Sequence, residues 1–259
     1  MVYHDRMLTP PGRQVLLFAA GGISFALPLM AVREIVRLPP DPEHPASDRS
    51  IALAHALGLE GDPRFALVLA DSAPSELRVD EMRGVGDLAE AEVFRLPARS
   101  VAARPSPFAA AVRLGEVLHL ELAPAALLDS RTVVWRPPPE QHDLPPAERE
   151  LVAERGGRAL AVPLSLVVQV IERARLSPVP LAPPGHRGLL YHGRALHSVW
   201  DVASLLGWPD SGKPEVILLL DAGGTTAGVL VDRVRGLGEG AGPVRRPRWD
   251  VLLAPQEEG

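Results

Sequence analysis

The sequence is poor in reactive and aromatic side chains. It contains no cysteine, which excludes disulfides, thiol catalysis and cysteine-based metal sites. Lys213 is the only lysine, so arginine carries almost all the positive charge, and aromatic residues make up only 4% of the chain. The net charge of −5 argues against a general nucleic-acid binder, because neutralising phosphates requires a basic face.

Segments that would target the protein to a membrane are also missing. Residues 1–14 are polar and interrupted by proline, unlike the apolar core of a signal peptide. No uninterrupted apolar run reaches the length of a membrane-spanning helix. We therefore expect a soluble, cytoplasmic protein that does not insert into a membrane.

No Walker, nucleophile-elbow or paired-carboxylate motif is present, which favours a protein without catalytic activity or cofactor. Residues 220–226, LDAGGTT, are similar to the phosphate-binding hairpin of actin-like ATPases, but an ordinary hairpin turn is the favoured interpretation. His186, His192 and His197 are close in sequence. Strand positions five apart face opposite sides and no metal-ligand spacing occurs, so we predict no metal site.

What the chain does contain is a repeat. Residues 21–36, GGISFALPLMAVREIV, return as GGRALAVPLSLVVQVI at 156–171, and LRVDEMRGVGDL at 77–88 returns as VLVDRVRGLGEG at 229–240. A repeat this long is the size of a small domain and is too large for a solenoid unit. The sequence therefore predicts two copies of one module.

Most of the chain consists of apolar runs of four to seven residues bounded by Gly, Pro, Asp or Ser, which is typical of β-strands. The clearest runs are 15–20, 24–28, 65–70, 117–122, 150–154, 158–162, 189–192, 216–220 and 227–231. Helices are expected only at 52–59 and 199–206, each with a glycine near its end. Residues 164–170 fit either one helical turn or the start of a strand.

Two segments lie outside this pattern. The proline-rich segment around 136–146 is expected to be a stiff spacer between the modules. The cluster Arg245, Arg246 and Arg248 beside Trp249 is interpreted as a solvated tail, because short charge runs usually face water.

The second half carries several spaced motifs in a fixed order. They are the A-x-P-x-x-x-V opening at 161–167, the P-x-x-P type entry at 178–184, the glycine-led strand at 188–194, V-x-D at 199–201 and G-x-x-V-D-x-V at 228–234. This series resembles the CheW family, the adaptors that couple chemoreceptors to the histidine kinase CheA in bacterial chemosensory arrays. The first half shares it more weakly, through 22–35, 57–58, 79–80 and 114–128.

The resemblance implies a mostly-β fold of two CheW-like modules, each built from paired small five-stranded (SH3-like) β-barrel subdomains with short helices. We assign 13–131 to a degenerate CheW-like domain, 132–147 to a Pro-rich linker and 148–255 to a CheW-like domain that lacks its closing strand. Each copy departs from the family in a different place. The first is shortened between Val36 and Gly58, where a strand is expected to be missing or collapsed, and the second has no counterpart of residues 112–122.

The function that the resemblance implies is docking without chemistry. A non-enzymatic adaptor would bind a CheA-type histidine kinase, the cytoplasmic tip of a chemoreceptor, or both. A divergent scaffold without receptor coupling is the alternative, and a phosphate-binding enzyme using residues 220–226 is a weaker one. Arginine suits such interfaces because its planar fork offers five donors. The expected partner-binding residues are Arg187, His192, Arg194, Val199 and Asp201.

One pair of carboxylates has two interpretations at this stage. Asp80 and Asp232 each follow a valine at matching places in the repeat. Each can cap a turn or pair locally, with Arg83 or Arg235 respectively, or contact a partner protein. The local interpretation is favoured, because turn and strand-end carboxylates are commonly paired.

Overall fold

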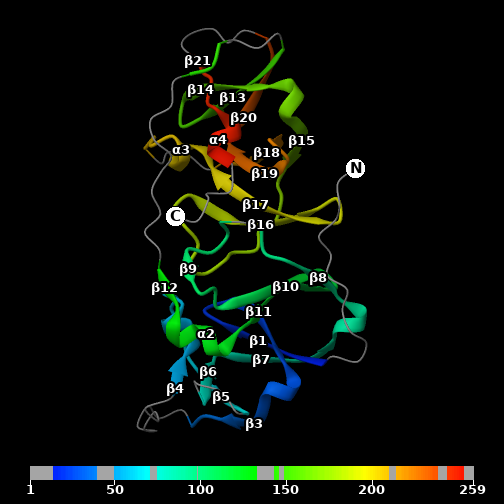
Figure 1. Cartoon of the computed structure of the whole chain (residues 1–259), viewed down its shortest axis with the longest axis vertical. Coiled ribbons are helices and arrows are strands. Elements are labelled where there is room, and N and C mark those ends of the chain that lie inside the picture. The colour runs from blue at the N-terminus through cyan, green and yellow to red at the C-terminus, as the bar shows by residue number, and fades with distance from the viewer. Residues whose placement is uncertain are drawn as a thin grey trace. The chain divides into compact units, whose positions relative to one another are not determined.

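The computed structural model describes residues 14–39, 50–70, 75–97, 99–132, 143–145, 149–209, 214–238 and 244–253 (Figure 1). The chain forms two compact units. Unit 1 comprises Met1–Leu96, Val101–Val133 and Val179–Leu181, and unit 2 comprises Pro97–Ser100, Val134–Pro178 and Ala182–Gly259. Both units are mostly β with short helices, which confirms the predicted fold class.

Unit 1 contains a six-stranded sheet in the order β7-β1-β2-β11-β10-β8, a four-stranded sheet β3-β5-β6-β4 and the pair β12-β9. Its strands are β1 Gln14–Ala20, β2 Ile23–Pro28, β3 Val32–Arg37, β4 Ser50–Ala52, β5 Phe65–Leu69, β6 Glu76–Val79, β7 Glu81–Asp87, β8 Glu92–Phe94, β9 Ala103–Arg104, β10 Phe108–Leu114, β11 Val117–Leu122 and β12 Arg131–Thr132. Its helices are α1 Leu53–Ala56 and α2 Pro124–Asp129, with 3-10 turns η1 Leu29–Ala31 and η2 Leu88–Glu90.

Unit 2 contains a five-stranded sheet β15-β18-β19-β17-β16 and a four-stranded sheet β20-β13-β14-β21. Its strands are β13 Glu150–Arg155, β14 Arg158–Pro163, β15 Val167–Glu172, β16 His186–His192, β17 Ala195–Asp201, β18 Val216–Ala222, β19 Thr225–Val231, β20 Arg233–Leu237 and β21 Val244–Arg245. Its helices are α3 Val202–Leu205 and α4 Trp249–Leu253, with the 3-10 turn η3 Leu164–Leu166.

The sequence repeat is also a structural repeat. Gly21 and Gly22 close the β1–β2 hairpin with φ of 56° and 76°, and Gly156 and Gly157 close β13–β14 with φ of 60° and 74°. Positive φ at both turn positions is the geometry that matches the twist of the flanking strands, and glycine adopts it without strain. In each copy a 3-10 turn and an edge strand, β3 or β15, then follow the hairpin.

The two copies differ where the sequence indicated. The parallel pairing of β17 with β19 recurs in unit 1 as β4 with β6, but β4 has only 3 residues. Within the described residues of unit 1, no strand corresponds to β16. In unit 2, the two-residue strand β21 pairs in parallel with β14, in the place that the 6-residue strand β11 takes beside β2.

Only one of the larger sheets has the expected five strands, and its edges are not joined by a backbone ladder. Over the described residues, the edges β15 and β16 are connected by one side-chain hydrogen bond between His192 and Gln169 and, just beyond β15, by the isolated bridge Ser177–Leu189. The sheet is therefore a barrel-like sheet that stops short of closure.

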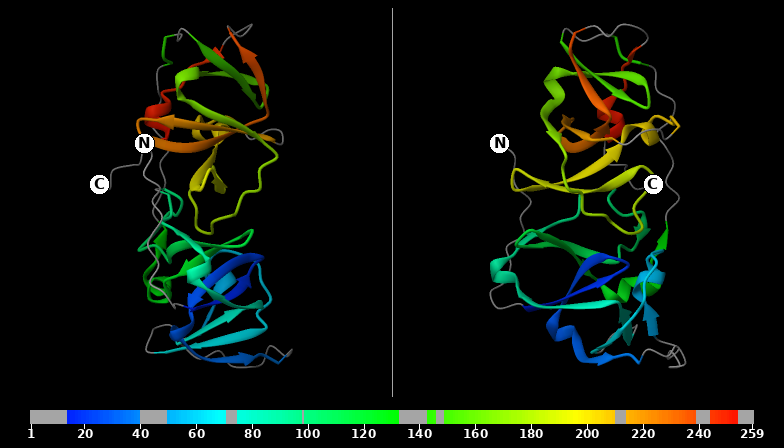
Figure 2. Two further views of the ribbon diagram at one scale, coloured as in Figure 1. Left: turned by 90° about the vertical axis from the view of Figure 1, so that its right-hand side faces the viewer. Right: turned by 180° about the vertical axis from the view of Figure 1, so that it is seen from behind.

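The core of unit 2 depends on a residue that the sequence analysis misplaced. Trp249 is 1% exposed and donates its indole N–H to the carbonyl of Ala161 at 3.2 Å, so the expectation of a solvated tail is wrong there. Figure 2 shows α4 (red) against the strands β18 and β19 (orange). The indole buries enough apolar area to outweigh the charges beside it, and Arg246 pairs with Glu150.

The expected helices are present but shorter. α1 and α3 each span four residues, and the glycines after them, Gly58 and Gly207, have φ of 70° and 65° as expected for C-terminal caps. Residues 164–170 hold both expected forms, a 3-10 turn followed by a strand. None of the helices in the described residues is long and apolar enough to cross a membrane.

Candidate functional site

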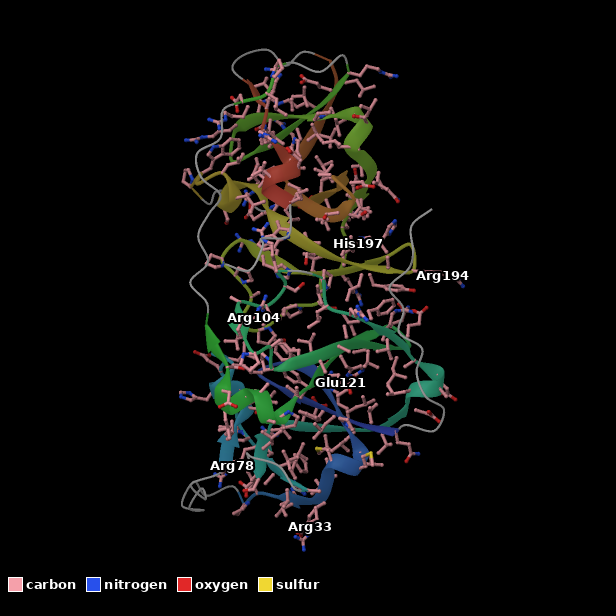
Figure 3. The ribbon with its side chains drawn as sticks, viewed as in Figure 1. Arg33, Arg78, Arg104, Glu121, Arg194 and His197 are labelled. Atoms are coloured by element: carbon pink, nitrogen blue, oxygen red, sulfur yellow. The ribbon has the colours of Figure 1, made fainter. Side chains whose placement is uncertain are left out.

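The predicted partner-binding residues lie on one hairpin of unit 2. Arg187 and His192 belong to β16, Val199 and Asp201 to β17, and Arg194 to the turn between them. Gly193 and Arg194 have φ of 59° and 64°, which makes a two-residue turn bounded by the His192–Ala195 pair. Figure 3 shows Arg194 at the outer end of this hairpin, with His197 farther along β17.

Three of the five residues present polar groups at the surface. Arg194 is exposed, and the Arg187 side chain is 40% exposed. His192 is half-buried, and its Nε2 lies 2.7 Å from Oε1 of Gln169 on β15. This contact holds the free end of the hairpin to the opposite edge of the sheet, so the hairpin is a defined surface and not a loose flap.

The other two residues are inside the unit. Val199 is fully buried and packs in a cluster with Leu190, Ile217 and Leu230. Asp201 is also fully buried. Because both side chains are buried, neither can touch a partner protein directly.

Asp201 is the centre of an ion network. Arg155 donates to it twice, from Nε to Oδ1 at 3.0 Å and from Nη2 to Oδ2 at 2.8 Å, and Arg187 donates from Nη2 to Oδ2 at 2.7 Å. The amide of Ala203 donates to Oδ1 at 3.0 Å, so Asp201 also caps α3. Burial alone would raise the pKa of Asp201, but the hydrogen bonds from Arg155 and Arg187 outweigh it and hold the pKa below its usual value.

The same arginine binds a second carboxylate. Nη1 of fully buried Arg155 donates to Oδ1 of Asp232 at 3.1 Å, and the amide of Gly156 donates to Oδ2 of Asp232 at 2.7 Å. The prediction that Asp232 pairs with Arg235 is wrong, because Arg235 reaches across to Glu154 instead. Arg155 comes from the β13 sheet and Asp201 from the β17 sheet, so the network links the two sheets of unit 2.

Unit 1 keeps one half of this arrangement. The amide of Gly21 donates to Oδ2 of Asp80 at 2.7 Å, as Gly156 does to Asp232. Ala20 and Ala52 stand where Arg155 and Asp201 stand in the repeat. The predicted pairing of Asp80 with Arg83 is wrong too, since Arg83 binds Glu81 and Ser24.

Sequence reasoning missed a second polar cluster in unit 2. Oγ of Ser198 lies 2.9 Å from Oγ of Ser100 and 3.3 Å from Nε2 of His186, whose ring meets Trp200 edge-on. Burial, reinforced by the charge of Arg99, lowers the pKa of His186 to about 4. Ser100 lies so far from Ser198 along the chain that no local motif pointed to the pair.

The edge strand β15 presents apolar side chains to solvent. Val168 is 57% exposed and Val170 is 41% exposed. Gln169 lies between them and bonds His192, so the apolar edge adjoins the polar hairpin. Exposed apolar residues gathered on one edge are a feature of protein interaction surfaces.

Two further candidates from the sequence were a phosphate-binding hairpin at residues 220–226 and a metal site at the histidines. Residues 220–226 form the β18–β19 hairpin, whose pairing continues to Ala222–Thr225 around Gly223 and Gly224 with φ of 66° and 81°. Within the parts of the chain that the structure describes, no group of three or more His, Asp or Glu side chains is placed to hold a metal ion.

Residues 151–239 match the family model of the CheW-like domain. No curated protein sequence matches the chain. Among solved structures, the scaffolding protein TtCheW from Thermoanaerobacter tengcongensis aligns with a TM-score of 0.33 and 20% identity over 34% of this chain and 62% of that protein.

The family match confirms the resemblance for residues 151–239 of unit 2, which are similar to the CheW-like domain. The matched range begins in β13 and includes the β16–β17 hairpin with its network. For unit 1, the support is the strand-by-strand correspondence described above. The chain spans less than two thirds of the length of the TtCheW structure.

Proposed function

We propose that the protein is a non-enzymatic adaptor of a cytoplasmic chemosensory complex and that unit 2 is its docking module. The observation that carries the proposal is the match of residues 151–239 to the CheW-like domain. The chemistry of the exposed surface supports the proposal, because the surface offers arginine and apolar side chains, the groups that protein interfaces use.

The apolar edge of β15 is the proposed contact for the regulatory domain of a CheA-type histidine kinase. Val168 and Val170 supply exposed apolar area, whose burial stabilises a complex. The corresponding edge β3 of unit 1 carries Arg33 in place of Val168 and Ile35 in place of Val170. A charge in the middle of the patch makes β3 the poorer apolar contact.

The β16–β17 hairpin is the proposed contact for an acidic or polar segment, such as a chemoreceptor tip. Arg187, His192 and Arg194 face solvent at least in part, whereas Val199 and Asp201 hold the hairpin from inside. A scaffold that has kept kinase binding but lost receptor coupling would use the β15 edge alone. The two surfaces can therefore be tested separately.

The test is binding of the full chain to a purified CheA-type regulatory domain and to a receptor cytoplasmic fragment, measured by calorimetry. Val168→Asp is expected to weaken kinase binding at least tenfold, and the matched variant Ile35→Asp in unit 1 should leave it unchanged. Arg194→Glu should weaken receptor binding and spare the kinase. Equal loss from Val168→Asp and Ile35→Asp, or no binding to either partner by the parent protein, would contradict the proposal.

A further inference from the structure

The equivalent carboxylates of the two copies, Asp80 and Asp232, differ in their hydrogen bonds. In unit 2 both oxygens of Asp232 are bonded, Oδ2 to the amide of Gly156 and Oδ1 to the guanidinium of Arg155. In unit 1 Oδ2 of Asp80 is bonded to the amide of Gly21, but Oδ1 is buried and accepts no hydrogen bond within the described residues. The atom left without a partner is the one that Arg155 binds in the other copy.

An unbonded carboxylate oxygen in a buried position is costly, because the charge loses its water and gains nothing in return. Such groups are rare enough in folded proteins that each needs an explanation. Unit 2 shows the arrangement that satisfies this carboxylate, which is a guanidinium donor. Unit 1 has lost its own donor, because alanine stands at position 20.

Asp80 also lines a hollow of about 280 Å³ on unit 1. Ala52 and Ala54 form part of its wall, and the exposed residues His55 and Glu60 stand at its rim. Gly61 packs against Asp80, where a Cβ would lie 2.8 and 2.9 Å from the two carboxylate oxygens. At Ala52 the wall of the hollow has a methyl group where unit 2 has the carboxylate of Asp201.

The charge balance in the hollow favours a cation. Asp80 and Glu60 contribute two negative charges to the lining. Arg78, labelled in Figure 3, also lines it, but its Nε donates to Glu76 at 2.9 Å, so its charge is already paired. An entering cation would therefore meet an uncompensated carboxylate.

We propose that the hollow beside Asp80 binds an alkylguanidinium group, supplied by an arginine side chain of a partner protein. Because Oδ1 of Asp80 is closed to solvent in the structure, the carboxylate would turn toward the hollow on binding. The guanidinium would then donate to Oδ1 as Arg155 donates to Asp232, so the partner would complete a site that unit 2 completes by itself. A planar donor fork fits a carboxylate better than an ammonium does. A divalent metal is a poorer fit, since the described residues hold no cluster of three His, Asp or Glu side chains for one. The inference concerns unit 1 and holds whichever partner unit 2 binds.

The amide of Gly21 is a direct reporter of this site, because it is bonded to the same carboxylate. We suggest titrating the ¹⁵N-labelled full chain with N-acetyl-L-arginine methylamide and following the amide signals of Gly21 and Gly61. The neutral isostere N-acetyl-L-citrulline methylamide is the matched probe. The expected result is a saturable shift of both signals with the arginine probe and none with the citrulline probe.

Three variants test whether the arginine probe binds at Asp80. Asp80→Asn keeps an oxygen for the Gly21 amide but removes the charge, and should weaken the arginine probe at least tenfold. Glu60→Gln, at the exposed rim, should weaken it two- to fivefold without a folding defect. Asp129→Asn makes the same change at the exposed end of α2 and should have no effect.

Several outcomes would overturn the inference. They are equal shifts with the arginine and citrulline probes, unchanged arginine binding in both Asp80→Asn and Glu60→Gln, or tighter binding of Mg²⁺ alone at Gly21. Free L-arginine binding at least tenfold more tightly than the blocked probe would assign the hollow to the amino acid and remove the partner protein from the proposal.

Discussion

Asp232 and Asp80 occupy the same place in two copies of one fold, yet only the first belongs to an ion network. The hairpin, the glycine pair and the bond from a glycine amide to the aspartate are common to both copies. Arg155, Asp201 and Arg187 are particular to unit 2. The fold of the module therefore does not require the network.

What the network adds is a link between the two sheets and the β16–β17 hairpin, the proposed docking surface. Arg155 connects one sheet to Asp201, and Asp201 fixes Arg187 on the hairpin that carries His192 and Arg194. In unit 1, where β4 has three residues and no β16 counterpart is described, there is no such hairpin for a network to hold. The ion network and the β16–β17 hairpin thus occur together in unit 2, and neither is found among the described residues of unit 1.

Among the variants that test this comparison, removal of Arg155 is expected to lower the stability of unit 2 the most. Arg155→Ala leaves Asp232 and Asp201 without their shared buried donor and should destabilise unit 2 by about 3–5 kcal/mol. Denaturant unfolding followed by tryptophan fluorescence measures it, because Trp200, Trp208 and Trp249, the tryptophans within the described residues, all belong to unit 2.

The double variant Arg155→Ala/Asp201→Ala reproduces the alanine pair of unit 1. It should lose less than the sum of the two single variants, because each single change strands a charge that the double change removes. Additive losses would show that the network is a set of independent contacts and would break the comparison with unit 1.

Acid should weaken unit 2 through His186. Its pKa is lowered to about 4 in the folded state by burial first and Arg99 second, from 6.5 in the unfolded chain. The unfolded state therefore binds the extra proton between these values, and stability falls by about 3 kcal/mol as the pH drops from about 6.5 to about 4. The loss from Asp201 begins lower, since its folded pKa lies below 3.8.

His186→Asn should flatten this pH dependence in the fluorescence-monitored unfolding of unit 2. His119, a buried histidine of unit 1 whose pKa is lowered first by burial and then by Arg83, is the matched control. If His119→Asn changed the unit 2 profile as much as His186→Asn does, the assignment to His186 would be wrong.

The sequence predicted the parts of both copies that rest on local rules. Paired glycines between apolar runs require a tight hairpin, and they were found in both units. The partner of Asp232 was missed because the contact is formed between distant strands. The signal available was Arg155 itself, a charged residue directly before the glycine pair where the first copy has Ala20. The Ser100–Ser198 contact left no such signal.

The glycine pair offers a smaller test of what the copies share. A Cβ on Gly21 would lie 2.6 Å from Cβ of Leu59, and φ is +56°, so Gly21→Ala should cost about 2–3 kcal/mol through clash and strain together. Gly22 and Gly157 have open space around them, so alanine there should cost about 1 kcal/mol each, from positive φ alone.

Circular dichroism of the full chain during thermal unfolding can report these three variants, since unit 1 has no tryptophan among its described residues. Equal losses for Gly21→Ala and Gly22→Ala would mean that the loop at Leu59 yields freely.

The smallest loss of stability is expected from breaking an arginine–carboxylate pair whose arginines are exposed at the surface. Glu154 forms ion pairs with Arg233, at 2.8 Å, and with Arg235. Hydrogen bonds from Arg233 first and Arg235 second lower the pKa of Glu154. The two arginine side chains are 67% and 38% exposed. Water and salt screen such a pair, so Glu154→Gln should cost less than about 1 kcal/mol and nothing measurable in 1 M NaCl. Glu81→Gln, which breaks the pair with Arg83 in unit 1, should cause a similarly small and salt-sensitive loss of stability. Fluorescence-monitored unfolding of Glu154→Gln at low and high salt measures the difference, and a salt-independent loss as large as that of Arg155→Ala would mean that burial does not separate the two kinds of site.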